Sequence, residues 1–374
     1  MIDSSNWYKF YMHEESDYSS VEALRIGANI LATQRLHGGW GKKLNVTEVY
    51  EDLAAKRDYE LQLEQNYDVA VLENYSHKSA GFDEGETPLY ARYLLRIANS
   101  TQDQIYVDAA KLGVDYVLSA QYPSGGWPQT YPMLVGYGAY VTFNDKAMTE
   151  AIKLSKDLAD NDYISIDEFT KLAAINSLER GVDYLLKSQI KINAVLTGWC
   201  AQHDHGTYAP LGARAYELPS VGGVASVDVV KFLMSISNPS CKLVSAVYGC
   251  LNWLESNQIS EKAWVKAYDK GLNRAVTIQI KEDPGSSNDP KDYTYTEAGY
   301  DKKLVESIDS DPQLWARFYD LTTGEPLFSN WDGLPQRSVD LIDYSLRINY
   351  SWYGSWAKTV IDSSSWKSAH PESH

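Results

Sequence analysis

Apolar residues recur at helical spacing along this chain, and four of the apolar segments end in an amide side chain. The three clearest segments are residues 28–34, 114–121 and 182–189, which end in Gln34, Gln121 and Gln189. Each of them leads into a turn that contains Gly and Trp. A fourth, degenerate segment, residues 251–257, ends in Asn257. The pattern predicts four related helices, three of which run into a Gly/Trp turn.

The spacing of these segments indicates an internal repeat. Gln121, Gln189 and Asn257 follow one another at intervals of 68 residues, and the first interval is 87 residues. A period of this length holds about two helices and their loops. Further helical patterns lie between the repeats, at residues 87–98, 145–158 and 226–234. We therefore expect an all-α fold, a toroid or incomplete helical barrel whose irregular loops and short strands form a cleft.

The rest of the pattern indicates how the chain is organised. Strand signals are sparse, and residues 276–280 give the best one. Residues 281–311 are polar and rich in turn formers, so we expect an exposed insertion there rather than a domain boundary. Residues 367–374 are expected to be a mobile tail. We interpret residues 1–374 as a single domain.

Charge and composition exclude several classes of function. The 374 residues carry 34 Lys and Arg against 50 Asp and Glu, a net charge of −16. This balance argues against nonspecific nucleic-acid binding, which needs a basic face, and against a basic helix on a membrane surface. No apolar run reaches the length of a membrane span. Cys200, Cys241 and Cys250 form no CxxC pair, so we expect free thiols.

The aromatic residues point to one candidate ligand class. The chain has 28 Tyr and 11 Trp but only 7 Phe. Tyr and Trp combine a flat apolar face with a polar edge, which suits the surface of a sugar. Half-buried tyrosines on helices would account for the same excess, and composition alone does not separate the two interpretations.

Two aspartates stand where a loop enters a predicted helix. These are Asp83 and Asp145, and Ser226 stands in a similar place. The simpler interpretation is that such side chains are N-caps, each of which stabilises a helix by ~1 kcal/mol. The alternative is a calcium site, because calcium takes carboxylate and carbonyl oxygens in loose geometry. Glu84 and Asn144 supply further oxygens nearby.

Arg214 and His203 also have both a structural and a chemical interpretation. Arg214 is close in sequence to Glu217, so an ion pair is the simpler interpretation. His203 stands beside Asp204 and would form an acid–base pair with it. A histidine in a Trp-rich loop is more often held by structural hydrogen bonds.

Five strings carry most of the candidate residues. They are Asp83-Glu-Gly-Glu-Thr87, Gly125-Gly-Trp-Pro-Gln129-Thr-Tyr-Pro132, Thr142-Phe-Asn-Asp145-Lys-Ala-Met148, Trp199-Cys-Ala-Gln-His-Asp204 and Ala213-Arg-Ala-Tyr-Glu-Leu-Pro-Ser220. Their order resembles that in pectate lyases of polysaccharide lyase family 10. The resemblance extends from about residue 28 to residue 354 and includes Gly38-Gly-Trp-Gly-Lys42 and Trp315-Ala-Arg-Phe-Tyr319.

The resemblance implies an (α/α)3 toroid that cleaves polygalacturonate, an acidic polysaccharide, by calcium-assisted β-elimination. It implies that Asp83 and Asp145, with Glu84 and Asn144, bind Ca²⁺, and that Arg214 is the catalytic base. The residues expected to bind substrate are Lys42, Arg92, Lys146, Trp127, Tyr216, Trp331 and Arg347. Because the pKa of arginine lies above ~12, we expect the rate to rise well above neutral pH.

Five positions, in three places along the chain, depart from the family pattern. Glu84 stands where Asn is usual, residues 88–90 stand where Thr-Thr-Glu is usual, and Trp331 replaces a common Arg. An extra carboxylate bears on metal binding, and the loss of an arginine removes one clamp for substrate carboxylates and offers a stacking ring. Asp83, Asp145 and Arg214 are unaffected.

Three other functions are compatible with parts of the sequence. The Gln-x3-Gly-x-Trp spacing at Gln34–Trp40 and Gln121–Trp127 also occurs in terpenoid cyclases, but the Asp-rich motif of those enzymes is missing from this sequence. An inverting glycoside hydrolase would use two carboxylates such as Asp83 and Asp145. A non-catalytic pectin-binding protein on the same fold would explain the departures at Glu84 and Trp331.

The implied substrate also bears on location and assembly. A polymer cannot enter a cell intact, so we expect the protein to be secreted or periplasmic, although the N-terminus, Met1-Ile-Asp-Ser-Ser, has no signal-peptide pattern. Nothing in the sequence points to an obligate oligomer, and we expect a monomer.

Overall fold

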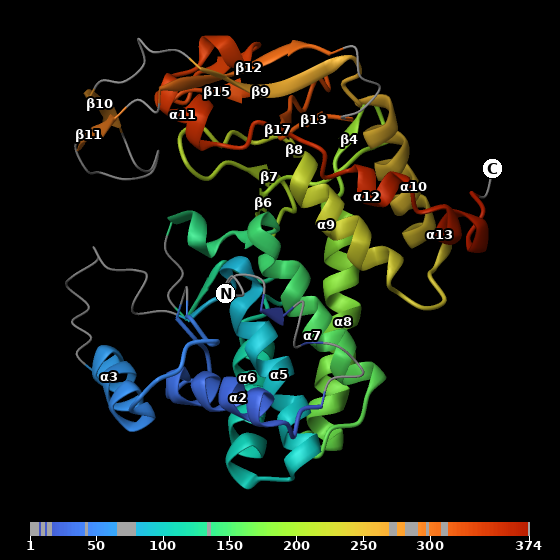
Figure 1. Ribbon diagram of the computed structural model, residues 1–374. Coiled ribbons are helices and arrows are strands. Elements are labelled where there is room, and N and C mark those ends of the chain that lie inside the picture. Colours follow the sequence, from blue (N-terminus) through green and yellow to red (C-terminus); the bar gives the residue numbers. More distant parts are fainter. Residues whose placement is uncertain are drawn as a thin grey trace. The chain divides into compact units, whose positions relative to one another are not determined.

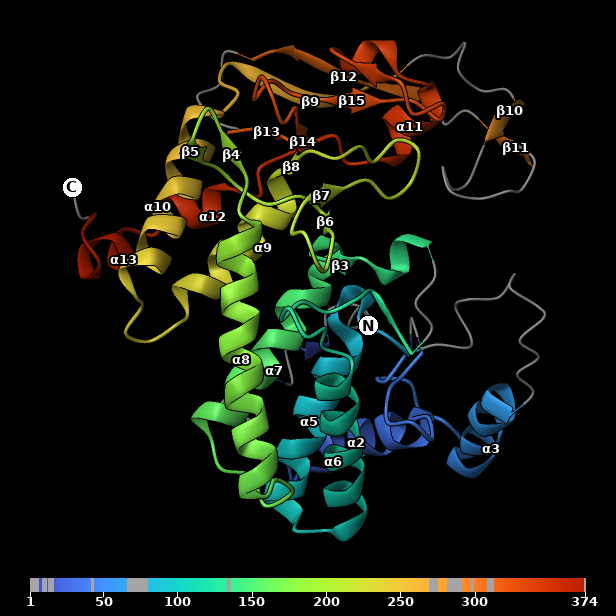
Figure 2. The same ribbon diagram turned by 180° about the vertical axis from the view of Figure 1, so that it is seen from behind.

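The computed structural model describes residues 7–8, 12, 17–41, 44–65, 80–132, 136–268, 275–280, 291–296, 299–307 and 313–372. The described chain combines helices, which make up about half of it, with many short strands, an arrangement compatible with the expected helical toroid (Figures 1 and 2). It divides into two compact units, Met1–Tyr184 and Leu185–His374. Within the described residues, no helix has the length and apolar character needed to cross a membrane.

The first unit is a set of packed helices with short strands at their ends (Figure 1). Its helices are α2 (Val21–Thr33), α3 (Leu53–Gln65), α5 (Glu86–Thr101), α6 (Gln104–Ser119), α7 (Ala147–Asp160) and most of α8 (Glu168–Ser188). α5 packs against α2, α6 and α7 and presents a largely apolar, buried face to them. Strand β1 (Ala80–Gly81) pairs with β2 (Thr130–Tyr131), and β3 (Val141–Thr142) precedes α7.

The second unit combines helices with two-stranded ladders (Figure 2). Its helices are α9 (Gly223–Met234), α10 (Cys241–Ser256), α11 (Tyr344–Asn349), α12 (Lys358–Ile361) and α13 (Ser364–Ala369). The antiparallel pairs are β4 (Lys191–Ile192) with β5 (Val195–Leu196), β6 (Gln202–His203) with β7 (Pro210–Leu211), β8 (Val221–Gly222) with β14 (Phe318–Tyr319), β9 (Lys262–Tyr268) with β12 (Tyr300–Glu306), β10 (Ala275–Ile280) with β11 (Lys291–Thr296), β13 (Trp315–Ala316) with β17 (Tyr353–Gly354), and β15 (Phe328–Ser329) with β16 (Pro335–Gln336). The predicted helices and the strand at 276–280 are confirmed.

The repeated glutamine joins each turn to the next helix pair. Gln34 Nε2 donates to Gly38 O in its own turn (3.1 Å) and to Ala109 O on α6 (2.9 Å). Gln121 and Gln189 repeat both hydrogen bonds, the former to Gly125 and Ser177 and the latter to Thr197 and Ala246. One bond of each amide satisfies a carbonyl of its own turn, and the other reaches a carbonyl in the interior of a later helix, so the amide ties the turn to that helix.

The repeated tryptophan is the second shared feature. Each indole Nε1 donates to a carbonyl near the end of the preceding helix, as in Trp40 to Ile30, Trp127 to Val117 and Trp199 to Leu185, all at 2.8 Å. Trp315 donates to Leu254 O in the same way (2.7 Å). The degenerate fourth repeat is therefore completed by Trp315, and strands β9–β12 lie between its helix and its tryptophan.

The strands β9–β12 also bear on the expected insertion. The extension that they form begins at Lys262, earlier than residue 281, because β9 pairs with β12 and β10 pairs with β11. At the C-terminus, α13 covers the start of the expected tail, where Tyr248 Oη donates to His370 O (2.9 Å). All three cysteines are free, as predicted.

We expect that replacing Gln189 with Met destabilises the protein by about 2 kcal/mol, because the buried Thr197 carbonyl loses its donor and the turn loses its hydrogen bond to Ala246 of α10. Urea unfolding of the variant and the wild type measures the difference. Gln104→Met is the matched control, because Gln104 is exposed and bonds only to Asp108 among the described side chains. Equal unfolding free energies for the two variants would contradict a bridging role for Gln189.

Candidate active site

Asp83 and Asp145 lie on two short turns that pack against each other within the first unit. Asp83 begins the 3-10 turn η2 (Asp83–Gly85), and Asp145 is in the middle of η4 (Asn144–Lys146). Each turn is preceded by a short strand and a single phenylalanine. It leads directly into a long helix, α5 after the first turn and α7 after the second. The sequence prediction that these two aspartates come together is consistent with this packing.

The two turns follow the same backbone path. Glu84 (φ 56°, ψ 7°) corresponds to Asp145 (φ 49°, ψ 32°), and Gly85 (φ 72°) corresponds to Lys146 (φ 64°). By this correspondence Asp83 matches Asn144. The structural counterpart of Asp145 is therefore Glu84, a relation that the sequence alone does not show.

The left-handed backbone of these turns is costly for residues other than glycine. Glu84, Asp145 and Lys146 all have positive φ, which disfavours an L side chain by about 1 kcal/mol or more at each position. The N-cap positions of α5 and α7 are Gly85 and Lys146, so the interpretation of the aspartates as N-caps is wrong. Clustered backbone strain of this kind is a feature of functional sites.

Hydrogen bonds hold the side chains of both turns. Asp83 Oδ1 accepts from the buried Gln129 Nε2 (3.0 Å), and Asp145 Oδ2 accepts from Asn144 Nδ2 (2.7 Å). Lys146 Nζ donates to Tyr8 Oη (3.2 Å) and lies 5.6 Å from the centre of that ring. Glu84 and Asp145 are both exposed, so their carboxylates are open to a ligand from solvent.

The donors at the two turns are chemically suited to calcium. Asp83, Glu84, Asp145 and Asn144 offer only carboxylate and amide oxygens, which a hard cation prefers. In the described part of the chain no three His, Cys, Asp or Glu side chains are grouped so as to hold a metal ion. A calcium ion at these turns would therefore complete its coordination with backbone, water or substrate oxygens, as its loose geometry allows.

Arg214 belongs to a tight turn in the second unit. Glu217 N donates to Arg214 O (2.8 Å), and the buried Glu217 carboxylate accepts from both Arg214 N (3.2 Å) and Arg214 Nη1 (3.1 Å). The expected ion pair with Glu217 is thus confirmed. The Arg214 side chain is still 45% exposed, so its guanidinium is accessible to a substrate.

Aromatic rings surround the Arg214 turn. The buried Tyr216 ring meets Trp331 edge-on at 5.1 Å and Tyr350 edge-on at 5.2 Å. Tyr350 Oη donates to Glu217 Oε1 (2.7 Å), and Trp331 Nε1 donates to Ser345 Oγ (2.9 Å). Burial, and then the Glu217 charge, hold the pKa of Tyr350 well above its ordinary value, so this phenol stays a hydrogen-bond donor.

Sequence reasoning did not identify Tyr350 as part of this group. Tyr350 is 133 residues from Glu217, and no local pattern connects them. Arg317 was noted only within a matching string, but its guanidinium lies 4.8 Å from the centre of the Tyr350 ring. Each residue stands two positions from a tryptophan in sequence, Arg317 from Trp315 and Tyr350 from Trp352, which is the only signal that marks them.

Three of the expected substrate-binding residues have other partners or lie elsewhere. Arg347 makes a two-point ion pair with Asp301 (2.7 and 2.9 Å) and donates to Ile342 O (2.6 Å). Trp127 is fully buried, so the expectation that its ring contacts substrate is corrected to a structural role. Lys42 lies outside the described residues.

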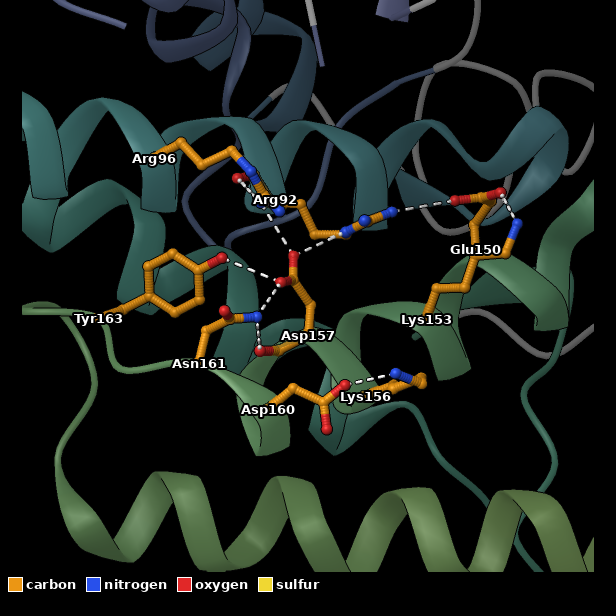
Figure 3. A network of polar contacts seen from close by, with 9 residues as sticks. All are labelled: Arg92, Arg96, Glu150, Lys153, Lys156, Asp157, Asp160, Asn161 and Tyr163. Atoms are coloured by element: carbon orange, nitrogen blue, oxygen red, sulfur yellow. Dashed lines mark hydrogen bonds and ion pairs between the residues drawn. The ribbon is translucent and has the colours of Figure 1, made fainter. Parts of the chain in front are cut away.

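Arg92, another expected substrate-binding residue, joins α5 to α7 (Figure 3). Its Nε donates to Asp157 Oδ2 (3.0 Å), and its Nη1 lies 3.5 Å from Glu150 Oε2. Arg96 Nη1 lies 2.9 Å from the same Asp157 oxygen. The Asp157 side chain is 6% exposed, so two arginines neutralise one buried carboxylate.

Replacing Asp157 with Asn is expected to destabilise the protein by about 3 kcal/mol, because it leaves Arg92 and Arg96 without their shared carboxylate. Burial alone would raise the pKa of Asp157, but the two arginines outweigh it and hold the pKa below 3.8. A carboxyl group whose pKa is lower in the folded than in the unfolded protein adds stability at any pH above its unfolded-state pKa. That stability is lost as the pH falls through its folded-state pKa.

The difference in the free energy of unfolding between wild type and D157N should therefore be largest at neutral pH and decrease below about pH 4. Urea unfolding at a series of pH values measures it. Asp160→Asn is the control, because Asp160 pairs with Lys156 at an exposed position and should change stability by less than about 1 kcal/mol. A D157N difference that stays constant down to pH 3 would contradict the ion-pair assignment.

His203 has a structural role. Its Nε2 accepts from Cys200 N (2.9 Å), and its Nδ1 lies 2.9 Å from Tyr208 O, to which it donates in that tautomer. Burial lowers the pKa of His203 to about 4, so the ring is neutral at ordinary pH. Asp204 instead binds the backbone N–H groups of Gly206 and Thr207. The structural interpretation of His203 is therefore the correct one.

Comparisons with known proteins identify the family of this chain. A family model described as pectic acid lyase matches residues 34–288 and 287–361. The family 10 polysaccharide lyase from Cellvibrio cellulosa is 25% identical over 100% of this chain and 98% of its own, with a TM-score of 0.69. A mutant of that lyase, in complex with trigalacturonic acid, is 24% identical over 98% of this chain and 97% of its own, also with a TM-score of 0.69.

A search of curated protein sequences gave no match. The family match covers well over half of the residues, and the solved structures share the fold over nearly their full length. The chain therefore belongs to the pectic acid lyase family and is a lyase that acts on polysaccharides.

Proposed function

We propose that this protein cleaves polygalacturonate by calcium-assisted β-elimination on an (α/α)3 toroid, with Arg214 as the base. The observation that supports the proposal is the contact between the two strained turns that carry Asp83 and Asp145. The complex of the Cellvibrio lyase with trigalacturonic acid supports an acidic substrate. A polymeric substrate implies a secreted or periplasmic enzyme.

Asp83, Glu84, Asp145 and Asn144 would hold the calcium ion. A bound calcium ion on the substrate carboxylate would acidify the proton on the neighbouring carbon and offset the negative charge that develops there. Gln129 fixes one oxygen of Asp83 by its hydrogen bond, so that carboxylate is already oriented before any ligand arrives. Such prior orientation lowers the cost of assembling the site.

Arg214 would remove the acidified proton. Glu217 holds its guanidinium from one side, and Tyr350 and the backbone of the turn hold Glu217 in turn. Free arginine has a pKa above ~12. The reaction should therefore speed up as the pH rises into the alkaline range, and a rate that peaks near pH 5 would contradict an arginine base.

Trp331 and Lys146 would bind the sugar chain. The Trp331 ring is half-buried and is held by Tyr216 and Ser345, so it offers a fixed face for a sugar. Lys146 is on the turn next to Asp145 and carries a charge opposite to that of the substrate. Arg92 and Arg347 would contribute only by exchanging their present carboxylate partners for substrate carboxylates.

The test is to incubate the protein with polygalacturonate and calcium and to follow the absorbance of the unsaturated product. We expect absorbance that EDTA abolishes and that added calcium restores. New reducing ends without absorbance would identify a hydrolase that uses the same carboxylates. Binding of the polymer without either signal would identify a non-catalytic pectin-binding protein.

A further inference from the structure

Strands β9 and β12 form a ribbon with an unusual arrangement of charges on one face. Lys266 is directly opposite Lys302, and the next pair on the same face is Tyr268 opposite Tyr300. Side chains two residues apart on a strand share a face, so these four residues lie together. We call them the Lys–Tyr face. Tyr268 is 82% exposed and Lys266 is also exposed.

The opposed lysines are unfavourable for folding. Like charges at directly opposite positions of an antiparallel pair repel each other. Burial, and then the charge of Lys266, lower the pKa of Lys302. Within the described residues neither lysine has an ion pair, although the chain as a whole carries a net charge of −16. The nearby contact is aromatic, with Lys266 Nζ 4.6 Å from the centre of the Tyr300 ring.

The ribbon itself is firmly attached to the second unit. Asp301, on the opposite face of β12, makes the two-point ion pair with Arg347 of α11. Tyr344 Oη donates to Tyr300 O (2.7 Å), and the Trp264 and Tyr353 rings lie 5.2 Å apart. Trp264 shares the face of Lys266 and is the point at which that face packs on the unit, so the Lys–Tyr face lies beyond this anchor on a fixed support.

We propose that the Lys–Tyr face is a second binding surface for the acidic polysaccharide, made of residues other than those of the two turns and Arg214. The proposal rests on the proposed function for the identity of the polymer. A uronate unit presents an apolar C–H face, which suits the tyrosine rings, and a carboxylate, which suits the lysines. Two positive charges side by side match the repeating carboxylates of such a chain.

A second attachment point would act on long substrates only. A polymer held at one surface reaches the other at a raised effective concentration, provided that the chain spans both. A trisaccharide is too short for this effect unless the two surfaces are contiguous. The Lys–Tyr face should therefore contribute to the affinity for polygalacturonate and to its KM, and it should leave kcat and the reaction of trigalacturonate unchanged.

The test uses the full chain in EDTA, so that binding is measured without turnover. We expect the double variant Lys266→Gln/Lys302→Gln to bind polygalacturonate about tenfold more weakly by affinity electrophoresis. The matched control is Lys303→Gln/Lys231→Gln, which removes the same charge from the opposite face of β12 and from α9. The control should bind within about twofold of the wild type.

A second measurement guards against misfolding. Removal of the lysine repulsion should leave the double variant Lys266→Gln/Lys302→Gln, the Lys–Tyr variant, at least as stable in urea as the wild type. Equal losses of affinity in both double variants, or an unchanged affinity in the Lys–Tyr variant, would overturn the proposal. So would equal binding of a neutral galactan or of single-stranded DNA by the wild type.

The outcome separates this proposal from the proposed reaction. If the wild type shows no lyase activity but the Lys–Tyr variant loses polymer binding, the binding surface stands and the reaction falls. If the wild type is an active lyase and the variant keeps its affinity and its KM on the polymer, the reaction stands and the binding surface falls.

Discussion

Replacing Arg214 with Lys should lower kcat on polygalacturonate by about a thousandfold, while the affinity for the polymer in EDTA stays within about threefold. General-base catalysis contributes a factor of about 10²–10⁴, and the loss appears in kcat because the base acts only in the transition state. Lysine keeps a positive charge but not the guanidinium geometry that Glu217 Oε1 holds at 3.1 Å. Initial rates of absorbance increase at saturating calcium measure the effect.

Two further variants of the second unit make the Arg214 result specific. Arg337→Lys makes the same exchange at an exposed arginine that pairs with Asp320, and it should keep nearly full activity. Glu217→Gln keeps the shape of the side chain but removes the charge that positions Arg214. That variant should lower kcat, because the guanidinium loses the carboxylate that orients it. Residual activity above a tenth of wild type in R214K would exclude Arg214 as the base.

The repeated helices were predictable from local spacing because the repeat is built from residues close together in sequence. Gln34, its turn and Trp40 lie within seven residues, so the apolar period and the Gly/Trp turn predict the unit directly. The fourth repeat was not recognised as complete. Strands β9–β12 separate Asn257 from Trp315, and a tryptophan displaced so far has no local signal.

The candidate site was predictable in part, for a similar reason. The prediction placed Asp83 and Asp145 at two loop–helix junctions, and the packing of these junctions follows from the packing of α5 against α7. The N-cap interpretation failed because capping preferences assume an extended N-cap residue, whereas Gly85 and Lys146 are left-handed here. Positive φ at a lysine cannot be inferred from residue type.

Ion pairs between residues far apart in sequence were the other feature that the sequence did not predict. Arg92 and Arg347 matched the expected substrate-binding positions, yet each is engaged with a carboxylate far away in sequence, Asp157 and Asp301 respectively. A basic residue in sequence has no preferred partner until the fold brings acids to it. The buried Trp127 is a similar case, because its Gly/Trp turn serves the repeat and places its ring inside the unit.

The correspondence between the two turns changes how the metal ligands should be weighed. Glu84 occupies the backbone position that Asp145 occupies in the other turn, and Asp83 occupies that of Asn144. The site would thus offer one half-buried residue and one exposed residue from each turn. Three of these four positions carry a carboxylate, so the local negative charge favours a divalent cation and opposes an acidic substrate until that cation is bound.

Replacing Asp145 with Asn should weaken calcium binding by about a hundredfold, because calcium affinity follows the number of charged ligands and the site has few to lose. Calorimetric titration with calcium measures the dissociation constant directly, without any reliance on turnover. A second readout is thermal unfolding, since a ligand that binds only the folded state raises its stability with ligand concentration. The calcium-dependent rise in melting temperature should be clear in the wild type and lost in D145N.

Asp108→Asn is the matched control for D145N, because it removes one exposed carboxylate from α6 in the same unit. It should bind calcium as the wild type does, because salt screens the effect of a distant exposed charge on the calcium affinity. High calcium should restore lyase activity to D145N if the ion is needed and only its affinity has changed. Unchanged calcium affinity in both D145N and Asp83→Asn would mean that the ion, if it is used at all, binds elsewhere, and the strained turns would then need another explanation.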